Sequence, residues 1–256
     1  MKYRSILIPA LIWLSLSGVA RTEAHDSRVF ELRTYYAHEG KLEALLARFG
    51  DHTCRIFEKH GIENIGYWVP EDNPDNVLIY IIAFPSRLDR ESMWKAFIND
   101  PEWKAAAKAS TASGRLVERI DSLFLKATDY SMPIKRVQSE PERLFELRTY
   151  KAAKGRMHHL DARFRDHTIG LFAKHGMENL VYFHPWADQE GASDTLIYII
   201  AHKDHAGRQA AFAAFRDDLD WREVRANSEA RAGGSLTVKG GVTSQILRPT
   251  YFSPMK

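Results

Sequence analysis

The stretch Phe-Glu-Leu-Arg-Thr-Tyr at residues 30–35 returns unchanged at residues 145–150. Behind it, Asp-His-Thr at residues 51–53 returns in register at residues 166–168. Motifs that recur in the same order and at the same separation indicate an internal duplication. The chain is therefore predicted to hold two copies of one module, and a loop around residues 188–194 is longer in the second copy.

Each copy has the sequence pattern of a module that contains both strands and helices. Apolar and polar residues alternate over 28–36, which predicts a half-buried strand, and apolar residues at helical spacing predict a helix over 40–60. Asp100-Pro101 is a helix-start signal. The other elements predicted for the first copy are strands at 62–69, 77–84 and 116–125 and helices at 86–98 and from 100 onward.

The order β-α-β-β-α-β is the ferredoxin-like arrangement, which places helices on one face of the sheet only. The open face must be covered, and a second copy in the same chain can cover it by packing sheet against sheet. The predicted fold class is thus α+β, with two tandem ferredoxin-like modules that form one intramolecular, pseudo-symmetric α/β barrel.

The N-terminus has the pattern of a secretory signal peptide. Lys2 and Arg4 precede an apolar run at residues 6–16, and small residues follow it. This run is short for a membrane span, so we expect cleavage, a periplasmic or secreted protein and no span after cleavage. The predicted organisation is a signal peptide at 1–24, a first module at 25–131, a linker at 132–143 and a second module at 144–256.

The composition is that of a globular protein, with 45% hydrophobic and 27% charged residues. The formal net charge is +3, and basic residues alternate with acidic ones instead of forming runs. This balance gives no electrostatic reason to expect nucleic acid as a partner. The single cysteine, Cys54, is replaced by Ile169 in the second copy, which is typical of a small apolar helix residue.

The chain resembles the NIPSNAP family. The resemblance rests on residues 30–35, on His52-Thr53 and on Ile-Gly-Tyr-Trp-Val-Pro at 65–70, with matching segments at 172–177 and 182–185. It covers nearly all of the chain after the signal peptide and implies two tandem modules of the dimeric α/β-barrel superfamily. That superfamily includes cofactor-independent oxygenases, haem peroxidases and small-molecule binders, so the resemblance implies a fold more firmly than an activity.

The first strand carries the first candidate site. Its alternation puts Phe30 and Leu32 on one face and Glu31, Arg33 and Tyr35 on the other. We expect the apolar face against the helices and the polar face inside the barrel. The second copy presents Glu146, Arg148 and Tyr150 in the same way. Two interpretations stay open: Arg and Tyr bind an anionic or oxygenated ligand, or Glu and Arg pair structurally.

Four histidines recur at matching positions of the two copies, namely His52 and His60 with His167 and His175. They are candidates for a general base or an axial haem ligand, and the alternative is a helix-face or helix-cap role. His52 and His60 lie about 12 Å apart along a helix, too far to share one metal ion. No metal site is predicted.

Aromatic residues recur on the second strand of each copy, as Tyr67 and Trp68 and as Tyr182 and Phe183. They predict either the wall of an apolar pocket or ordinary core packing. The sequence thus supports two hypotheses. One is a protein that binds a small apolar or aromatic molecule in a barrel pocket, with or without oxidative chemistry. The other is a non-enzymatic interaction or scaffold protein of the cell envelope. No cofactor is expected, although haem is an option, and a homo-oligomer is an option as well.

Overall fold

The computed structural model describes residues 26–134 and 142–256. The predicted signal peptide and the centre of the predicted linker lie outside these residues. The first module consists of β1 (Val29–Ala37), α1 (Leu42–Arg48), η1 (Phe49–Thr53), α2 (Cys54–Lys59), β2 (Glu63–Pro70), β3 (Val77–Phe84), α3 (Arg87–Asn99), α4 (Pro101–Ser110) and β4 (Val117–Ala127). The second module consists of β5 (Leu144–Ala152), α5 (Met157–Arg163), η2 (Phe164–Thr168), α6 (Ile169–Lys174), β6 (Glu178–Pro185), β7 (Thr195–His202), α7 (His205–Asp217), α8 (Leu219–Arg231) and β8 (Thr237–Pro249).

The predicted element order is confirmed in both modules, because the residues that begin the helices act as expected. Ser86 caps α3 by accepting from the backbone of Asp89, and Asp100 caps α4, with Pro101 at the first helical position. The long predicted helix at 40–60 is one continuous stretch that is π-helical in its middle, at η1.

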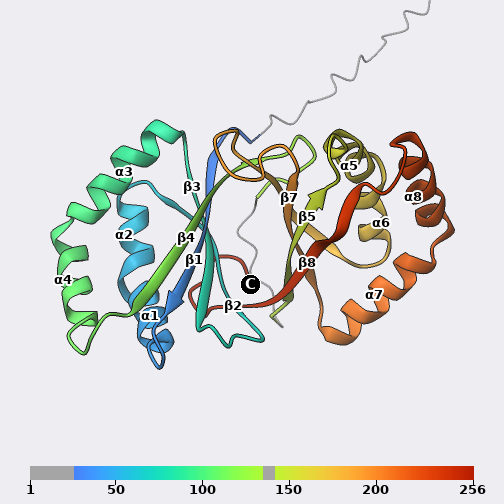
Figure 1. The fold of residues 1–256 in the computed structure, drawn as a ribbon. Helices are drawn as coiled ribbons and strands as arrows, with labels where there is room; N and C mark the ends of the chain where they lie inside the picture. The colour runs from blue at the N-terminus through green and yellow to red at the C-terminus, as the bar shows by residue number, and fades with distance from the viewer. Residues whose placement is uncertain (1–25, 135–141) are drawn as a thin grey trace, which may run out of the picture.

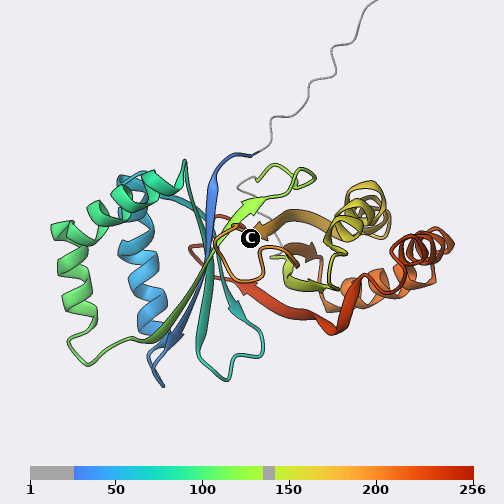
Figure 2. The same cartoon turned by 45° about the horizontal axis from the view of Figure 1, so that its top comes forward.

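The eight strands of the described residues form one closed barrel in the order β1-β3-β2-β8-β5-β7-β6-β4. Every neighbouring pair is antiparallel, and the two modules meet at the short pairs β2–β8 and β4–β6. The helices of the first module cover one outer side of the barrel, and the helices of the second cover the opposite side (Figure 1). The turned view in Figure 2 shows the same two helical layers with the strands between them. The predicted intramolecular α/β barrel is confirmed.

The barrel interior is an apolar core to which both modules contribute. Phe30 packs on Phe183 at a ring-centroid distance of 4.9 Å, and Trp68 packs on Phe145 at 5.6 Å. These are equivalent contacts, since the duplication relates each pair to the other. Two further cores, one in each module, lie between the sheet and its own helices.

This arrangement reverses the expected orientation of the first strand. Phe30 and Leu32 belong to the barrel interior, and Tyr35 belongs to the core beneath the helices. The prediction that Glu31, Arg33 and Tyr35 face the interior is therefore wrong. The interior joins two sheet faces that are both apolar, whereas the helices carry basic residues that can pair with a buried carboxylate.

The end of each module packs on the other module. The backbone N–H of Tyr67 donates to Ser253 Oγ at 3.0 Å, and Phe252 packs on the Tyr67 ring at 5.3 Å. In the matching contact, the N–H of Tyr182 donates to Ser131 Oγ at 3.0 Å, and Tyr130 packs on the Tyr182 ring. Each C-terminal segment, 128–131 and 250–253, therefore completes the core of its neighbour.

Among the described residues, no helix combines the length and the apolar character that a membrane span requires.

Candidate functional site

The polar face of β1 forms a buried ion network beneath the helices. The Glu31 carboxylate is fully buried, pairs with Arg33 and accepts hydrogen bonds from Arg90 Nε at 3.0 Å and from Ser122 Oγ at 2.6 Å. Burial acts to raise the pKa of Glu31, but the hydrogen bond from Arg90, the charge of Arg33 and the hydrogen bond from Ser122 outweigh it. The pKa of Glu31 is lowered, and the carboxylate stays ionised.

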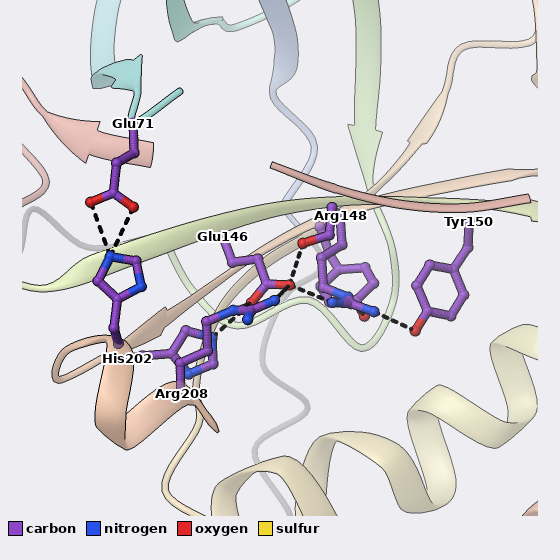
Figure 3. A network of polar contacts seen from close by, with 9 residues as sticks. Glu71, Glu146, Arg148, Tyr150, His202 and Arg208 are labelled. Carbon is purple, nitrogen blue, oxygen red and sulfur yellow. Dashed lines mark hydrogen bonds and ion pairs between the residues drawn. The ribbon is translucent and has the colours of Figure 1, made fainter. Parts of the chain in front are cut away.

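The second module repeats this network with one addition. Figure 3 shows the Glu146 carboxylate between Arg148 and Arg208, with the Tyr150 hydroxyl on the far side of Arg148. The added partner is His202, whose Nε2 lies 3.0 Å from Glu146 Oε2. The matching position of the first module holds Phe84. A search for residues shared by the two copies therefore does not find His202.

Each module also has a cavity between its sheet and its helices. The first cavity has a volume of about 250 Å³ and the second about 280 Å³. Matching residues of the two copies line them, which makes the cavities equivalent. These pairs are Tyr35 and Tyr150, Arg48 and Arg163, Phe49 and Phe164, Thr53 and Thr168, Phe57 and Phe172, Phe97 and Phe215, and Trp103 and Trp221. We call them the first and the second pocket.

The π-helical segments build one wall of these pockets. In the first module, Arg48 precedes η1, while Phe49 and Thr53 lie in it, and all three line the first pocket. Thr53 Oγ1 donates to the carbonyl oxygen of Arg48 at 3.1 Å, and Thr168 makes the same bond to Arg163. Single π-helical turns within α-helices are frequent at functional sites, because the wider turn shifts the side chains around it.

Arg48 and Arg163 are functional candidates that the sequence interpretation missed. The Nε atom of each is buried and has no hydrogen-bond partner among the described residues. Each guanidinium lies over a tryptophan ring at 5.3 Å, that of Trp103 or Trp221. Burial lowers the pKa of both arginines, although an arginine remains charged at neutral pH. Their signal was present in the repeat, where Arg-Phe recurs directly before the segment with Asp-His-Thr.

The four predicted histidines lie away from these pockets. His52 and His167 are exposed on the outer face of the helices. His60 and His175 lie at helix ends, where their Nε2 atoms are 2.7 and 2.6 Å from the carboxylates of Asp100 and Asp218. The latter contacts hold two helices together, and hydrogen bonds from Lys59 and His60 lower the pKa of Asp100.

The predicted aromatic set is divided between two compartments. Trp68 and Phe183 are fully buried in the barrel interior, whereas Tyr67 and Tyr182 lie in the cores beneath the helices. The two tyrosine hydroxyls donate to Asn64 and Asn179 at 2.5 Å. Arg33 and Arg148 pair with the buried carboxylates. Of the predicted set, Tyr35 lines the first pocket, and Arg148 and Tyr150 line the second.

The residues of the pockets do not fit haem. Neither pocket wall includes a histidine, and the described part of the chain holds no group of three His, Cys, Asp or Glu side chains suited to a metal ion. Cys54 is partly buried, and burial raises the pKa of its thiol to about 12, so the thiol is protonated at neutral pH.

Comparison with known proteins agrees with the two-module barrel. Two solved structures share the fold over 88% of this chain, and both are described as putative monooxygenases. The one from Fusobacterium nucleatum has a TM-score of 0.56 at 10% identity and is covered over 93% of its length. The one from Lactobacillus acidophilus has a TM-score of 0.54 at 8% identity and is covered over 95%. At these identities the likeness concerns the fold alone.

Sequence comparison identifies the family. A NipSnap homolog from Dictyostelium discoideum is 25% identical over 113 residues, which are 44% of this chain and 49% of that protein. The match thus spans about half the length of the curated relative. The NIPSNAP family model matches residues 30–132 and again residues 145–254, which together make up most of the chain. The chain therefore belongs to the NIPSNAP family, with one family module in each half of its barrel.

Proposed function

We propose that the chain is an exported protein that binds a small apolar or aromatic molecule in each of its two pockets. One observation carries the proposal: both modules have a cavity at the same place, with matching aromatic walls and an arginine whose buried Nε atom lacks a hydrogen-bond partner among the described residues. A cavity on the order of 150 Å³ can hold benzene. The first pocket, at about 250 Å³, has room for a two-ring aromatic compound.

The pockets replace the site that the sequence suggested. Ligand binding was expected inside the barrel, but the interior is occupied by apolar side chains from both modules. A scaffold protein would have a tightly filled barrel, and the barrel interior is filled. The support for a ligand comes instead from the two equivalent cavities between the sheet and the helices. If neither cavity binds a small molecule, the hypothesis of a scaffold protein remains.

Oxidation of the bound molecule is a second candidate function. The observation in its favour is that two solved structures with this barrel are described as putative monooxygenases. In this reaction class, dioxygen would oxidise an electron-rich aromatic ligand. Oxygen uptake by the purified protein in the presence of its extracted ligand would support it, and a ligand released unchanged without oxygen uptake would exclude it.

The binding experiment uses the mouths of the two pockets. Ile120 lines the first pocket and is 44% exposed, and Val242 lines the second and is 40% exposed. We expect 2-naphthoate to bind at two sites in calorimetry, and Ile120→Trp or Val242→Trp to remove one site each by filling the mouth. Val238→Trp is the matched control, because Val238 lies on the same strand, is 42% exposed and is not part of the pocket wall.

Binding that survives the double substitution Ile120→Trp and Val242→Trp would place the probe elsewhere and contradict the proposal. Mass spectrometry of the native protein adds an independent test, since a co-purified small molecule should be lost from the same double variant. Absence of both probe binding and any extractable molecule would leave the scaffold hypothesis.

A further inference from the structure

The first pocket contains a cation that the ion network of the sheet does not use. Arg33 is paired with Glu31, but Arg48 has no such partner in the part of the chain that the structure describes. Its Nη1 lies 3.5 Å from Ser110 Oγ, and its Nε has no hydrogen-bond partner. Within residues 26–134 and 142–256, no carboxylate oxygen approaches the Arg48 guanidinium within 4.0 Å.

A half-buried guanidinium without a carboxylate partner loses part of its hydration. The surrounding wall is mostly aromatic and aliphatic, so the charge gives up hydration without gaining a counter-ion. The planar guanidinium presents paired N–H groups that match the two oxygens of a carboxylate. A ligand that carries a carboxylate on an apolar body would therefore satisfy both the charge and the walls of the first pocket.

The second pocket differs at this point. Arg163 is only 7% exposed, and its Nη1 lies 4.0 Å from Glu229 Oε1. Glu229 lines the second pocket, whereas the matching position of the first pocket holds Thr111. The second module thus supplies an internal carboxylate, although Glu229 also pairs with Arg225 at 3.3 Å.

Of the other arginines of the two walls, Arg148 in the second pocket is paired with Glu146, and the remaining three lie at the mouths. Arg115 in the first pocket and Arg216 and Arg225 in the second are exposed. Water and salt screen such charges, so they attract an anion from solution more than they hold it. The difference in binding strength should therefore come from two matching pairs of positions, Arg48 with Thr111 in the first pocket and Arg163 with Glu229 in the second.

We infer that the ligand of the first pocket is an apolar or aromatic carboxylate whose carboxylate group binds Arg48, and that Glu229 weakens the second pocket for the same anion. This inference rests on the proposed function, because it names the chemical class of the molecule that the pockets bind. It also gives the two modules different tasks, with the first pocket as the stronger anion site.

The experiment compares 2-naphthoate with its neutral amide, 2-naphthamide, by calorimetry at pH 7. The first pocket is measured in the Val242→Trp background and the second in the Ile120→Trp background. We expect the first pocket to favour the carboxylate by on the order of tenfold or more, in line with a charge-assisted hydrogen-bond pair. Arg48→Met should remove this preference while binding of the amide persists.

Exchanging Thr111 and Glu229, the residues that differ between the two pockets, gives the matched controls. Thr111→Glu should reduce 2-naphthoate binding in the first pocket, and Glu229→Thr should increase it in the second. Arg48→Met should leave the melting temperature unchanged or raise it, because it removes a charge without a counter-ion. Equal binding of amide and carboxylate in the first pocket overturns the inference and leaves the proposed function intact. Binding of neither compound overturns both.

Discussion

Two fully buried carboxylates, Glu31 and Glu146, connect the first strand of each module to its helices. Each pairs with an arginine of its own strand and with an arginine of the helix above, so each stands between two positive charges. Removing one such carboxylate leaves the guanidinium groups close together without a counter-ion. The cost of an uncompensated buried charge should therefore govern the stability of both modules.

We predict that Glu146→Gln lowers the free energy of unfolding by about 3 kcal/mol or more, in the range expected when one partner of a buried ion pair is removed. Glu31→Gln should cost less, because the first module has no counterpart of His202. Urea denaturation followed by circular dichroism at pH 7 measures both. Glu118→Gln is the control, since Glu118 is exposed on β4; a similar small cost for all three variants would contradict the prediction.

The same carboxylates contribute to the pH dependence of stability. The pKa of each is lowered in the folded state, so each contributes stability above the ordinary glutamate pKa of about 4.3 and loses it as the pH falls towards the lowered value. The free energy of unfolding should thus decrease between pH 5 and pH 3. The double variant Glu31→Gln and Glu146→Gln should show a shallower decrease, with a remainder from Asp100 and Asp218, whose pKa values are also lowered.

At the scale of single residues, the sequence suggested the pairing of Glu31 with Arg33 but not the side of the sheet on which it lies. Alternation identified Glu31, Arg33 and Tyr35 as one face, and their pairing was one of the two interpretations considered. The side depends on which groups cover each face of the strand. Arg90, which is distant in the sequence, pairs with Glu31 from the helix side. Arg48 recurs as Arg163, yet nothing local tells an arginine with a counter-ion from one without.

At the scale of elements, β2 and β6 show how the barrel interior accommodates two different sequences. Gly66 and Trp68 lie two residues apart on the inner face of β2, and a Cβ atom on Gly66 would lie 2.2 Å from the Trp68 ring. The matching residues of β6 are Val181 and Phe183, both buried in the same interior core. A larger ring beside a glycine in one strand corresponds to a smaller ring beside a valine in the other.

We predict that Gly66→Val lowers the free energy of unfolding by about 2 kcal/mol, the cost of overpacking a filled core. Adding Trp68→Phe should recover most of this loss, because the pair then copies β6. The double-mutant cycle is measured by urea denaturation. If the two substitutions instead lower the free energy of unfolding additively, the packing of β6 cannot be transferred to β2, and the prediction is wrong.

The elements themselves were largely predictable, since their periodicity and their start signals are local. The strand at 28–36 and the helix start at Asp100-Pro101 were found within one or two residues. The π-helical segments were not predicted. An α-helix and a π-helix present similar apolar spacing over a single turn, and the difference lies in which carbonyl each N–H reaches.

At the scale of the whole molecule, neither module can bury its inner sheet face alone. Phe30 needs Phe183, and Trp68 needs Phe145. A module by itself also leaves the edge of β4 without the partner strand β6. Because β6 is the counterpart of β2, a second copy of the first module could supply an equivalent strand.

We predict that residues 26–134 expressed alone form a homodimer that closes a barrel through two β2–β4 contacts. Light scattering coupled to size-exclusion chromatography should give twice the mass of the fragment. The matched control is residues 26–127, which lack the segment that completes the neighbouring core and should associate more weakly. A folded monomer of residues 26–134 with a cooperative thermal transition would refute the prediction.

Closure of one barrel within one chain was predictable from the duplication, because it follows from covering two open sheet faces. The exchange of C-terminal segments was not predictable. Residues 122–131 and 244–253 resemble each other in sequence, but resemblance does not say which module receives which segment. That choice follows from the strand order, in which β8 lies beside β2.

The exchanged segments have a consequence for the order in which the protein can be completed during translation. The first module leaves the ribosome before residues 250–253 are synthesised, yet Phe252 and Ser253 complete the core around Tyr67. The earliest part of the chain must therefore wait for the latest, whereas the second module finds Tyr130 already synthesised. A chain that lacks only its last residues would keep Tyr130 on Tyr182 but leave the core around Tyr67 without Phe252.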